Sequence, residues 1–182
     1  MNMMPEVTFV YLGSKIPSYT NASLRLVGKH NRVRIRICAS ESVRNQLEDP
    51  KYLIPLENFY EAAEFQKVKQ RIGLDPHFRS GLWVKSLERF FVLKQLMIRY
   101  SLKTIFHAEL DQVLFNVEDL INKLKYLEYR GIFYPMHTPD RAVASVFYCN
   151  DVNELCKLLQ YTKSGPMIPH EMALLANWAK NP

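Results

Sequence analysis

The sequence predicts an α/β protein, a three-layer sandwich in which helices cover both faces of a mostly parallel central sheet. Short runs of β-branched and aromatic residues alternate along the chain with segments of helical periodicity. The 182 residues are 48% hydrophobic and 12% aromatic, enough for one sizeable core. Because no repeat, low-complexity tract or linker interrupts this pattern, residues 1–182 are predicted to form a single domain.

Two strands and a helix are predicted first. Val7–Gly13 is a β-branched and aromatic run that ends at glycine, as a buried strand would. After a proline-containing loop, Asn21 is expected to cap a helix that ends near His30. Val33–Ala39 alternates apolar and basic residues, which indicates a strand with one wetter face.

Helical signals dominate the next sixty residues. Three helices are predicted: a short one opened by Ser40 or Ser42 and ended by Asp49-Pro50, one over Phe59–Ile72 stopped by Gly73, and one over Leu82–Tyr100. The last has the clearest pattern, a broad apolar stripe with Glu88 and Arg89 largely outside it.

The second half continues the alternation of strands and helices. The predicted elements are a strand over Thr104–Glu109, a helix from Asn116 or Val117 through Leu127, a strand at Ile132–Tyr134, a strand over Ala142–Tyr148, a helix after Asn150 or Asp151, and a last helix over Glu171–Ala179.

The Thr104–Glu109 strand ends in two carboxylates spaced two residues apart, Glu109 and Asp111. Alternate side chains of an extended chain point the same way, so Glu109 and Asp111 are expected on one face, together with His107. Two adjacent acids repel each other, and burying them is costly without a cation. A hard divalent metal that carries a phosphate explains the pair; acids of a solvated loop are the alternative.

The ends of two predicted strands mark the expected binding site. In mostly parallel sheets, ligands bind outside the carboxyl ends of the strands. Gly13-Ser14 and Glu109–Asp111 both lie at such ends. If the two strands are neighbours, both loops border one crevice.

Four segments carry a resemblance to a known family: Val7–Gly13, Trp83–Phe91, His107-Ala108-Glu109-Leu110-Asp111 and Ala142–Tyr148. In their order, the chain resembles the nucleotide-diphospho-sugar transferases, glycosyltransferases with the Rossmann-like GT-A fold. The resemblance covers most of the chain as a pattern rather than residue by residue. Glu109 departs from the commoner Asp-x-Asp form, which puts its role as a direct metal ligand in doubt.

The resemblance implies a metal-dependent glycosyltransferase that uses a UDP- or GDP-sugar. Asp111 would bind a Mn²⁺ or Mg²⁺ ion that bridges the donor's diphosphate, and Glu109 would act through a water or the ribose. Leu12, Gly13 and Ser14 would lie against the nucleoside, and Lys85, Ser86 and Arg89 would line the donor pocket or reach the diphosphate. The acceptor would be a polysaccharide, a glycan or a lipid-linked glycan.

Four of these positions keep two interpretations. Arg89 either binds phosphate or forms a salt bridge on the helix surface, and His107 is either a metal partner or a hydrogen-bonded core histidine. His170 and Glu171 either complete the metal site or supply a base, or they form a helix N-terminus. Family members usually continue beyond the point where this chain ends. The chain is therefore expected to be a minimal member, a fragment or a non-catalytic nucleotide-sugar-binding remnant.

The net charge and the cysteine content limit which partners and which cellular compartment are expected. The net charge of +6 favours anionic ligands or peripheral contact with an anionic membrane, whereas a basic nucleic-acid-interacting protein is the less favoured alternative because no recognition motif is present. The oligomeric state stays open. Cys38, Cys149 and Cys156 form no CxxC motif and are expected to be reduced, the first two buried, in a cytoplasmic protein. Neither a transmembrane-length run nor a signal peptide at Met1–Pro5 is expected.

Overall fold

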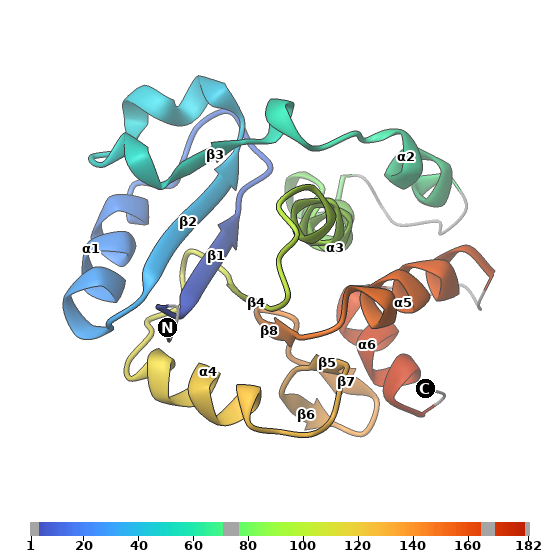
Figure 1. The fold of residues 1–182 in the computed structure, drawn as a ribbon. Coiled ribbons are helices and arrows are strands. Elements are labelled where there is room, and N and C mark those ends of the chain that lie inside the picture. Colours follow the sequence, from blue (N-terminus) through green and yellow to red (C-terminus); the bar gives the residue numbers. More distant parts are fainter. Residues whose placement is uncertain (1–3, 71–76, 165–169, 181–182) are drawn as a thin grey trace.

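A six-stranded sheet forms the centre of the computed structural model, which describes residues 4–70, 77–164 and 170–180. The strand order is β3-β2-β1-β4-β8-β5, and every neighbouring pair is parallel except those made by β8 (Figure 1). The strands are β1 (Glu6–Val10), β2 (Arg34–Ala39), β3 (Leu53–Pro55), β4 (Ile105–Ala108), β5 (Ile132–Phe133) and β8 (Val146–Cys149). The predicted α/β class with a mostly parallel sheet is therefore confirmed.

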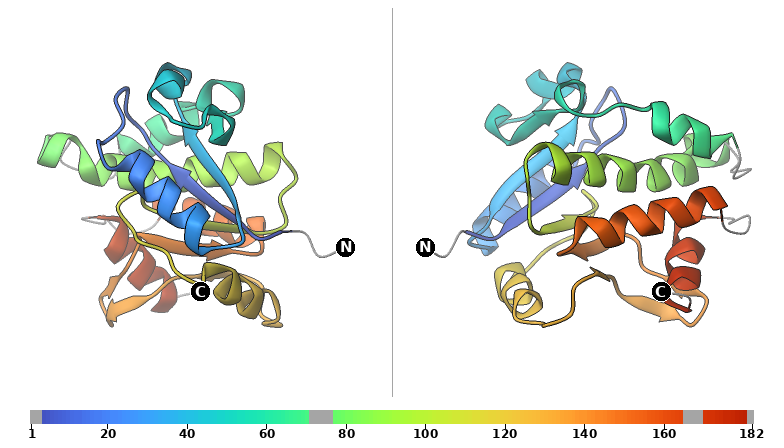
Figure 2. Two further views of the ribbon diagram at one scale, coloured as in Figure 1. Left: turned by 90° about the vertical axis from the view of Figure 1, so that its left-hand side faces the viewer. Right: turned by 45° about the vertical axis from the view of Figure 1, so that its right-hand side comes forward.

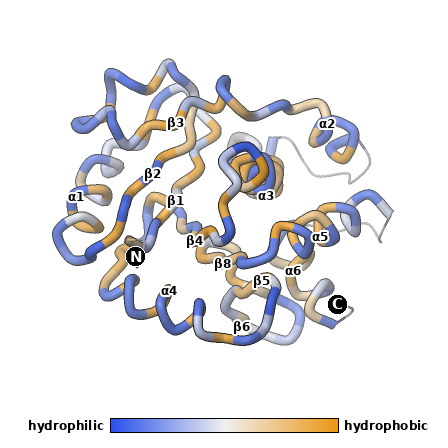
Figure 3. The backbone as a smooth tube through the Cα atoms, viewed as in Figure 1, coloured by the Kyte–Doolittle hydropathy of each residue, from blue (hydrophilic) through white to orange (hydrophobic). Residues whose placement is uncertain are grey.

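Helices cover both faces of this sheet (Figure 2). α1 (Thr20–His30) and α4 (Val117–Lys125) pack on one face, and α2 (Ala63–Lys69), α3 (Leu82–Arg99), α5 (Val152–Ser164) and α6 (Glu171–Lys180) lie on the other. Side chains alternate between the two cores, since Phe9 packs with α1 and α4 whereas Val10 packs with α3. Figure 3 shows the hydrophobic stretches that follow the central strands and α3.

The predicted strand over Ala142–Tyr148 is wrong in its first half. β7 (Arg141–Ala142) instead pairs with β6 (Met136–Thr138), an unpredicted strand, in a small antiparallel ribbon. Only β8 belongs to the central sheet. The break between the two strands has no turn signal in the apolar run Ala142–Tyr148. A tertiary contact holds this segment instead, since the amide of Val143 donates to the carbonyl of Pro135 at 2.7 Å.

Several helix boundaries also differ from the prediction. The helix expected over Phe59–Ile72 is α2, which is only seven residues long, and Gly73 lies outside the described residues. Asn21 does not cap α1, because its side chain bonds the backbone of Gln46 and Glu48 instead. Ser40 does cap a short 3₁₀ helix, Glu41–Gln46, and Asp151 accepts from the amide of Asn153 at the start of α5.

The cysteines fit the expected burial. Cys38 and Cys149 are buried free thiols in the core, and Cys156 is partly exposed. Burial raises the pKa of the Cys149 thiol to about 12, so the thiol stays protonated and unreactive. Within the described part of the chain, no helix has both the length and the apolar character to cross a membrane.

Candidate functional site

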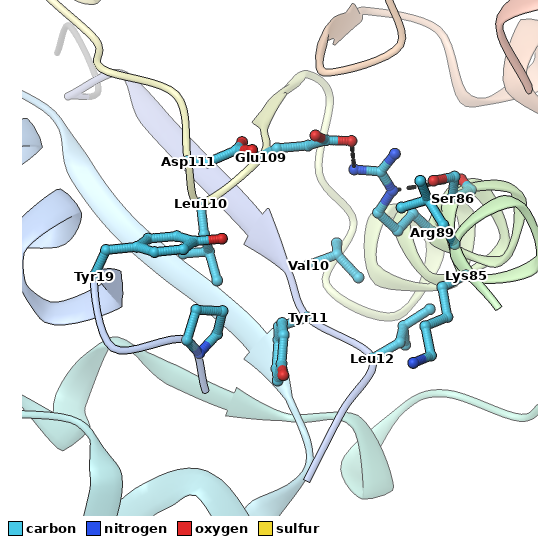
Figure 4. Close-up of a pocket in the computed structure, with 12 residues that line it drawn as sticks. Val10, Tyr11, Leu12, Tyr19, Lys85, Ser86, Arg89, Glu109, Leu110 and Asp111 are labelled. Atoms are coloured by element: carbon cyan, nitrogen blue, oxygen red, sulfur yellow. Dashed lines mark hydrogen bonds and ion pairs between the residues drawn. The ribbon is translucent and has the colours of Figure 1, made fainter. Parts of the chain in front are cut away.

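The chain segments that follow β1 and β4 meet at one cavity, because the two strands are parallel neighbours with Thr8 opposite His107. The cavity has a volume of about 230 Å³ (Figure 4). Its lining combines aromatic, cationic and acidic side chains: Val10, Tyr11, Leu12, Pro17, Tyr19, Leu82, Lys85, Ser86, Arg89, Glu109, Leu110 and Asp111. The expected crevice at these two strand ends is therefore present.

Arg89 and Glu109 form an ion pair across this cavity, from α3 to the end of β4 (Figure 4). The Arg89 side chain is 9% exposed and that of Glu109 is 31% exposed. The helical pattern placed Arg89 on the surface, but the structure buries it, because β1 and α6 both pack against α3. One guanidinium nitrogen, Nη2, is buried and has no hydrogen-bond partner among the described residues.

Asp111 differs from Glu109 in its surroundings. β4 ends at Ala108, so Glu109 and Asp111 lie in the turn that follows rather than on an extended strand. Asp111 is exposed, and within the described ranges its carboxylate pairs with no cation. The acidic pair is thus unequal, with Glu109 engaged by an arginine and Asp111 available to a ligand.

A divalent metal fits this site only if a bound phosphate-bearing substrate supplies part of its coordination. In residues 4–70, 77–164 and 170–180, no three histidine, cysteine or acidic side chains cluster closely enough to hold an ion by themselves. Asp111 supplies one unpaired carboxylate oxygen donor, of the type that Mn²⁺ and Mg²⁺ prefer. Magnesium in particular is commonly held by one or two carboxylates together with substrate phosphates.

His107 lies inside the core rather than at the cavity. It is 1% exposed, and its Nδ1 hydrogen-bonds the carbonyl of Thr8 at 2.9 Å across β1 and β4. Burial, with the nearby charge of Arg89, lowers the pKa of His107 to about 3, so the imidazole is neutral near pH 7. Its side chain contributes nothing to the cavity lining.

Aromatic side chains form the wall opposite α3. Leu12 lines the cavity, whereas Gly13 and Ser14 do not. Gly13 lies against Tyr11, and a Cβ at this position would lie 2.6–2.9 Å from the hydroxyl and ring of Tyr11, so that side chain would have to shift. Tyr11 and Tyr19 were not predicted as site residues; the available signal was that they flank the Gly13-Ser14 strand end, two residues before Gly13 and five after Ser14.

A second cavity of about 440 Å³ adjoins the first and shares Leu82, Ser86 and Glu109 with it. Together the two spaces reach the size range of small-molecule sites, about 300–1,000 Å³. The remaining lining residues come from α3, the β6–β7 ribbon and its return, and α6: Trp83, His137, Arg141, Ala142, Val143, Ala144, Ser145, Glu171 and Met172.

Glu171 is the buried acid of this second cavity. It is 5% exposed, its carboxyl group interacts with the Ser86 hydroxyl, and its Oε2 has no hydrogen-bond partner among the described residues. Burial raises the pKa of Glu171 to about 7, partly opposed by the attraction of Arg89. Glu171 therefore exchanges its proton near neutral pH, as a general base or acid requires.

His170 has a structural environment. Its Nδ1 accepts from the amide of Ala173 at 3.2 Å, which satisfies one free donor at the start of α6. Its ring also packs on Trp83 at 5.0 Å between centroids, and Trp83 stacks on Phe78 at 5.2 Å. His170 thus orients α6 and with it the neighbouring Glu171.

Comparison with known proteins decides the fold. No protein-family model and no curated protein matches the sequence. The structure of mouse xyloside xylosyltransferase 1 superposes with a TM-score of 0.62 at 8% identity, over 98% of this chain and 82% of that one. The chain has the GT-A fold.

A second solved structure supports the GT-A fold. The glycosyltransferase GlyE of Streptococcus pneumoniae TIGR4 superposes with a TM-score of 0.52 at 14% identity. The match covers 99% of this chain but only 44% of GlyE, so the chain spans less than half of that protein's length. At these identities the likeness establishes the GT-A fold alone.

Proposed function

We propose that this protein is a glycosyltransferase that moves a sugar from a nucleotide-sugar donor, with Mn²⁺ or Mg²⁺, to a glycan-type acceptor. One observation carries the proposal. Two adjoining cavities, the first at the carboxyl ends of β1 and β4, share Leu82, Ser86 and Glu109. Asp111 lines the first cavity and Glu171 lines the second. Such a pair of sites suits a reaction that joins two substrates.

The first cavity is proposed to hold the donor. Tyr11 and Tyr19 offer flat rings against a nucleobase. Lys85 and Arg89 supply positive charge for the diphosphate. Asp111 would hold the metal ion, which when bound neutralises charge on the departing nucleoside diphosphate. Glu109 would position Arg89 through their ion pair rather than bind the metal directly.

The second cavity is proposed to hold the acceptor. Glu171 would accept the proton of the acceptor hydroxyl as the new glycosidic bond forms and the bond from the sugar to the diphosphate breaks. Its raised pKa, about 7, makes it a stronger base than an ordinary carboxylate while leaving a substantial fraction ionised at neutral pH. Trp83 offers an apolar ring surface in this cavity for the sugar.

One observation favours a second candidate, a non-catalytic nucleotide-sugar-binding domain. Arg89 already engages Glu109, so one of the two predicted acids is withdrawn from metal binding. Cationic side chains such as Lys85 and Arg89 could hold the donor's diphosphate without a metal ion, which would permit donor binding without transfer of the sugar. Donor binding without transfer or hydrolysis distinguishes this candidate from the enzyme.

Calorimetric titration of UDP and GDP, with and without Mn²⁺, tests the proposal, followed by incubation with nucleotide sugars and detection of released diphosphate. We expect binding of one nucleotide to strengthen with Mn²⁺ and to weaken in Asp111→Ala. Binding that is absent, or equal with and without Mn²⁺ and unaffected by Asp111→Ala, would contradict it.

A further inference from the structure

A basic and aromatic edge lies at the end of the sheet opposite the two cavities. Lys103 precedes β4, Arg130 precedes β5, and Lys125 ends α4. β4 and β5 run in the same direction, both antiparallel to β8, so the two strands start at the same end of the sheet. These three cations line a third cavity of about 490 Å³ with Leu127 and Tyr129. We call these five residues the basic edge.

The cations of the basic edge are not neutralised within the described chain. None of the ion pairs found there involves Lys103, Lys125 or Arg130. The same cavity contains two acids, Glu128 and Asp151, and Asp151 is engaged in capping α5. Three exposed cations against two acids leave a net positive charge that attracts an anionic surface.

Large hydrophobic side chains stand beside these cations. Tyr126 is 84% exposed, Tyr129 is 79% exposed, and Leu127 is 45% exposed. Single exposed hydrophobics are common, but three within four residues next to basic side chains match the composition of membrane-interface segments. Tyrosine rings suit the level of the lipid headgroups, with the basic side chains toward lipid phosphates.

We propose that the basic edge docks on an anionic membrane surface. A lipid bilayer accommodates the exposed Leu127 side chain as well as the cations, whereas a nucleic acid would use only the charges and the tyrosine rings. Docking through this edge leaves the carboxyl ends of β1 and β4, and both cavities, facing away from the membrane. The proposal is independent of the proposed enzymatic function.

Co-sedimentation with phosphatidylcholine vesicles, with or without phosphatidylserine, tests the docking. We expect binding only to the vesicles with phosphatidylserine, weakened by salt. Lys103→Gln/Lys125→Gln/Arg130→Gln is expected to lower this binding on the order of 100-fold. Tyr126→Ser/Tyr129→Ser should weaken it without reducing the net charge.

A matched control removes the same charge elsewhere. Lys15, Lys29 and Lys67 are exposed and lie outside the basic edge, so their triple glutamine variant should retain vesicle binding. Equal loss in both triple variants would overturn the proposal, because net charge alone would then explain the binding. No binding to phosphatidylserine vesicles would also overturn the proposal. So would a result in which the wild type binds duplex RNA or DNA and the basic-edge triple variant loses that binding but keeps its vesicle binding.

Discussion

Arg89 in α3 and Glu109 after β4 form a largely buried ion pair, in which Arg89 lines the first cavity and Glu109 lines both. Glu171 lies near the same guanidinium, which lowers the pKa of that acid against the effect of its burial. One arginine therefore influences two acids, Glu109 through an ion pair and Glu171 through its charge. A change at Arg89 is expected to affect folding, donor binding and the ionisation of Glu171 together.

Arg89→Met should destabilise the fold by about 2 kcal/mol, because it leaves the mostly buried carboxylate of Glu109 without its cation. Arg89→Met/Glu109→Gln should recover part of this loss, with a coupling energy of about 1 kcal/mol in a double-mutant cycle from urea unfolding. Lys94→Met provides a control in the same helix and away from the cavities, since it breaks a comparably buried pair; Glu64 keeps its second partner, Lys163, so a smaller loss of stability is expected. Donor binding that is equally weak in Arg89→Met and in Lys94→Met would contradict a specific role for Arg89.

Asp111→Asn should lower Mn²⁺-dependent nucleotide binding at least tenfold, because an amide oxygen replaces the unpaired carboxylate. Glu109→Gln should instead reduce nucleotide binding with and without Mn²⁺ by similar factors, since Glu109 acts through Arg89. Titration of nucleotide at several Mn²⁺ concentrations separates the two effects. Loss of the metal dependence in Glu109→Gln but not in Asp111→Asn would reverse the assignment.

Glu171→Gln should lower sugar transfer by about 10²–10⁴-fold and leave nucleotide binding unchanged, because a general base is lost without altering the donor cavity. The wild-type rate should rise with pH through about 7 as Glu171 loses its proton. The variant rate should be flat over the same range. A pH profile shared by both proteins would show that another group titrates.

The pH dependence of stability gives a readout of Glu171 that needs no substrate. Its folded-state pKa is about 7 against an ordinary 4.5, so the native protein holds the proton more tightly. Its stabilising contribution is complete below about pH 4.5 and is lost as pH rises to 7, by up to about 3 kcal/mol. Urea unfolding at pH 5 and pH 8 should therefore show a smaller decline for Glu171→Gln than for wild type. Equal declines would contradict the raised pKa.

Gly13→Ala should weaken nucleotide binding severalfold and change stability by less than about 1 kcal/mol. The new Cβ would lie 2.6–2.9 Å from the hydroxyl and ring of Tyr11, and this side chain would move aside, giving up its exposed hydrogen bond to the carbonyl of Lys15. That movement alters the aromatic wall of the first cavity. Gly28→Ala is the control, because its nearest neighbour lies at 3.6 Å and α1 does not line either cavity. Unchanged nucleotide affinity in Gly13→Ala would exclude Tyr11 from the donor wall.

Local patterns in the sequence determined most of the elements. The apolar stripe of Leu82–Tyr100 predicted α3 nearly to the residue, since helical periodicity is a property of consecutive residues. The β-branched run at Val7–Gly13 predicted β1, and the acids at the end of the predicted Thr104–Glu109 strand marked the edge at which the first cavity lies. The prediction of one strand over Ala142–Tyr148 was wrong because strand pairing depends on distant partners and not on local composition.

The tertiary structure decided which of the marked residues act together. Only the pairing of β1 with β4 brings Tyr11 and Asp111 to one cavity, across about a hundred residues of sequence. Only the packing of α6 against α3 places Glu171 beside Arg89 and removes it from water. Alternation and spacing say which way a side chain points. The ionisation of an acid and the partner of a cation are set by what folds against them.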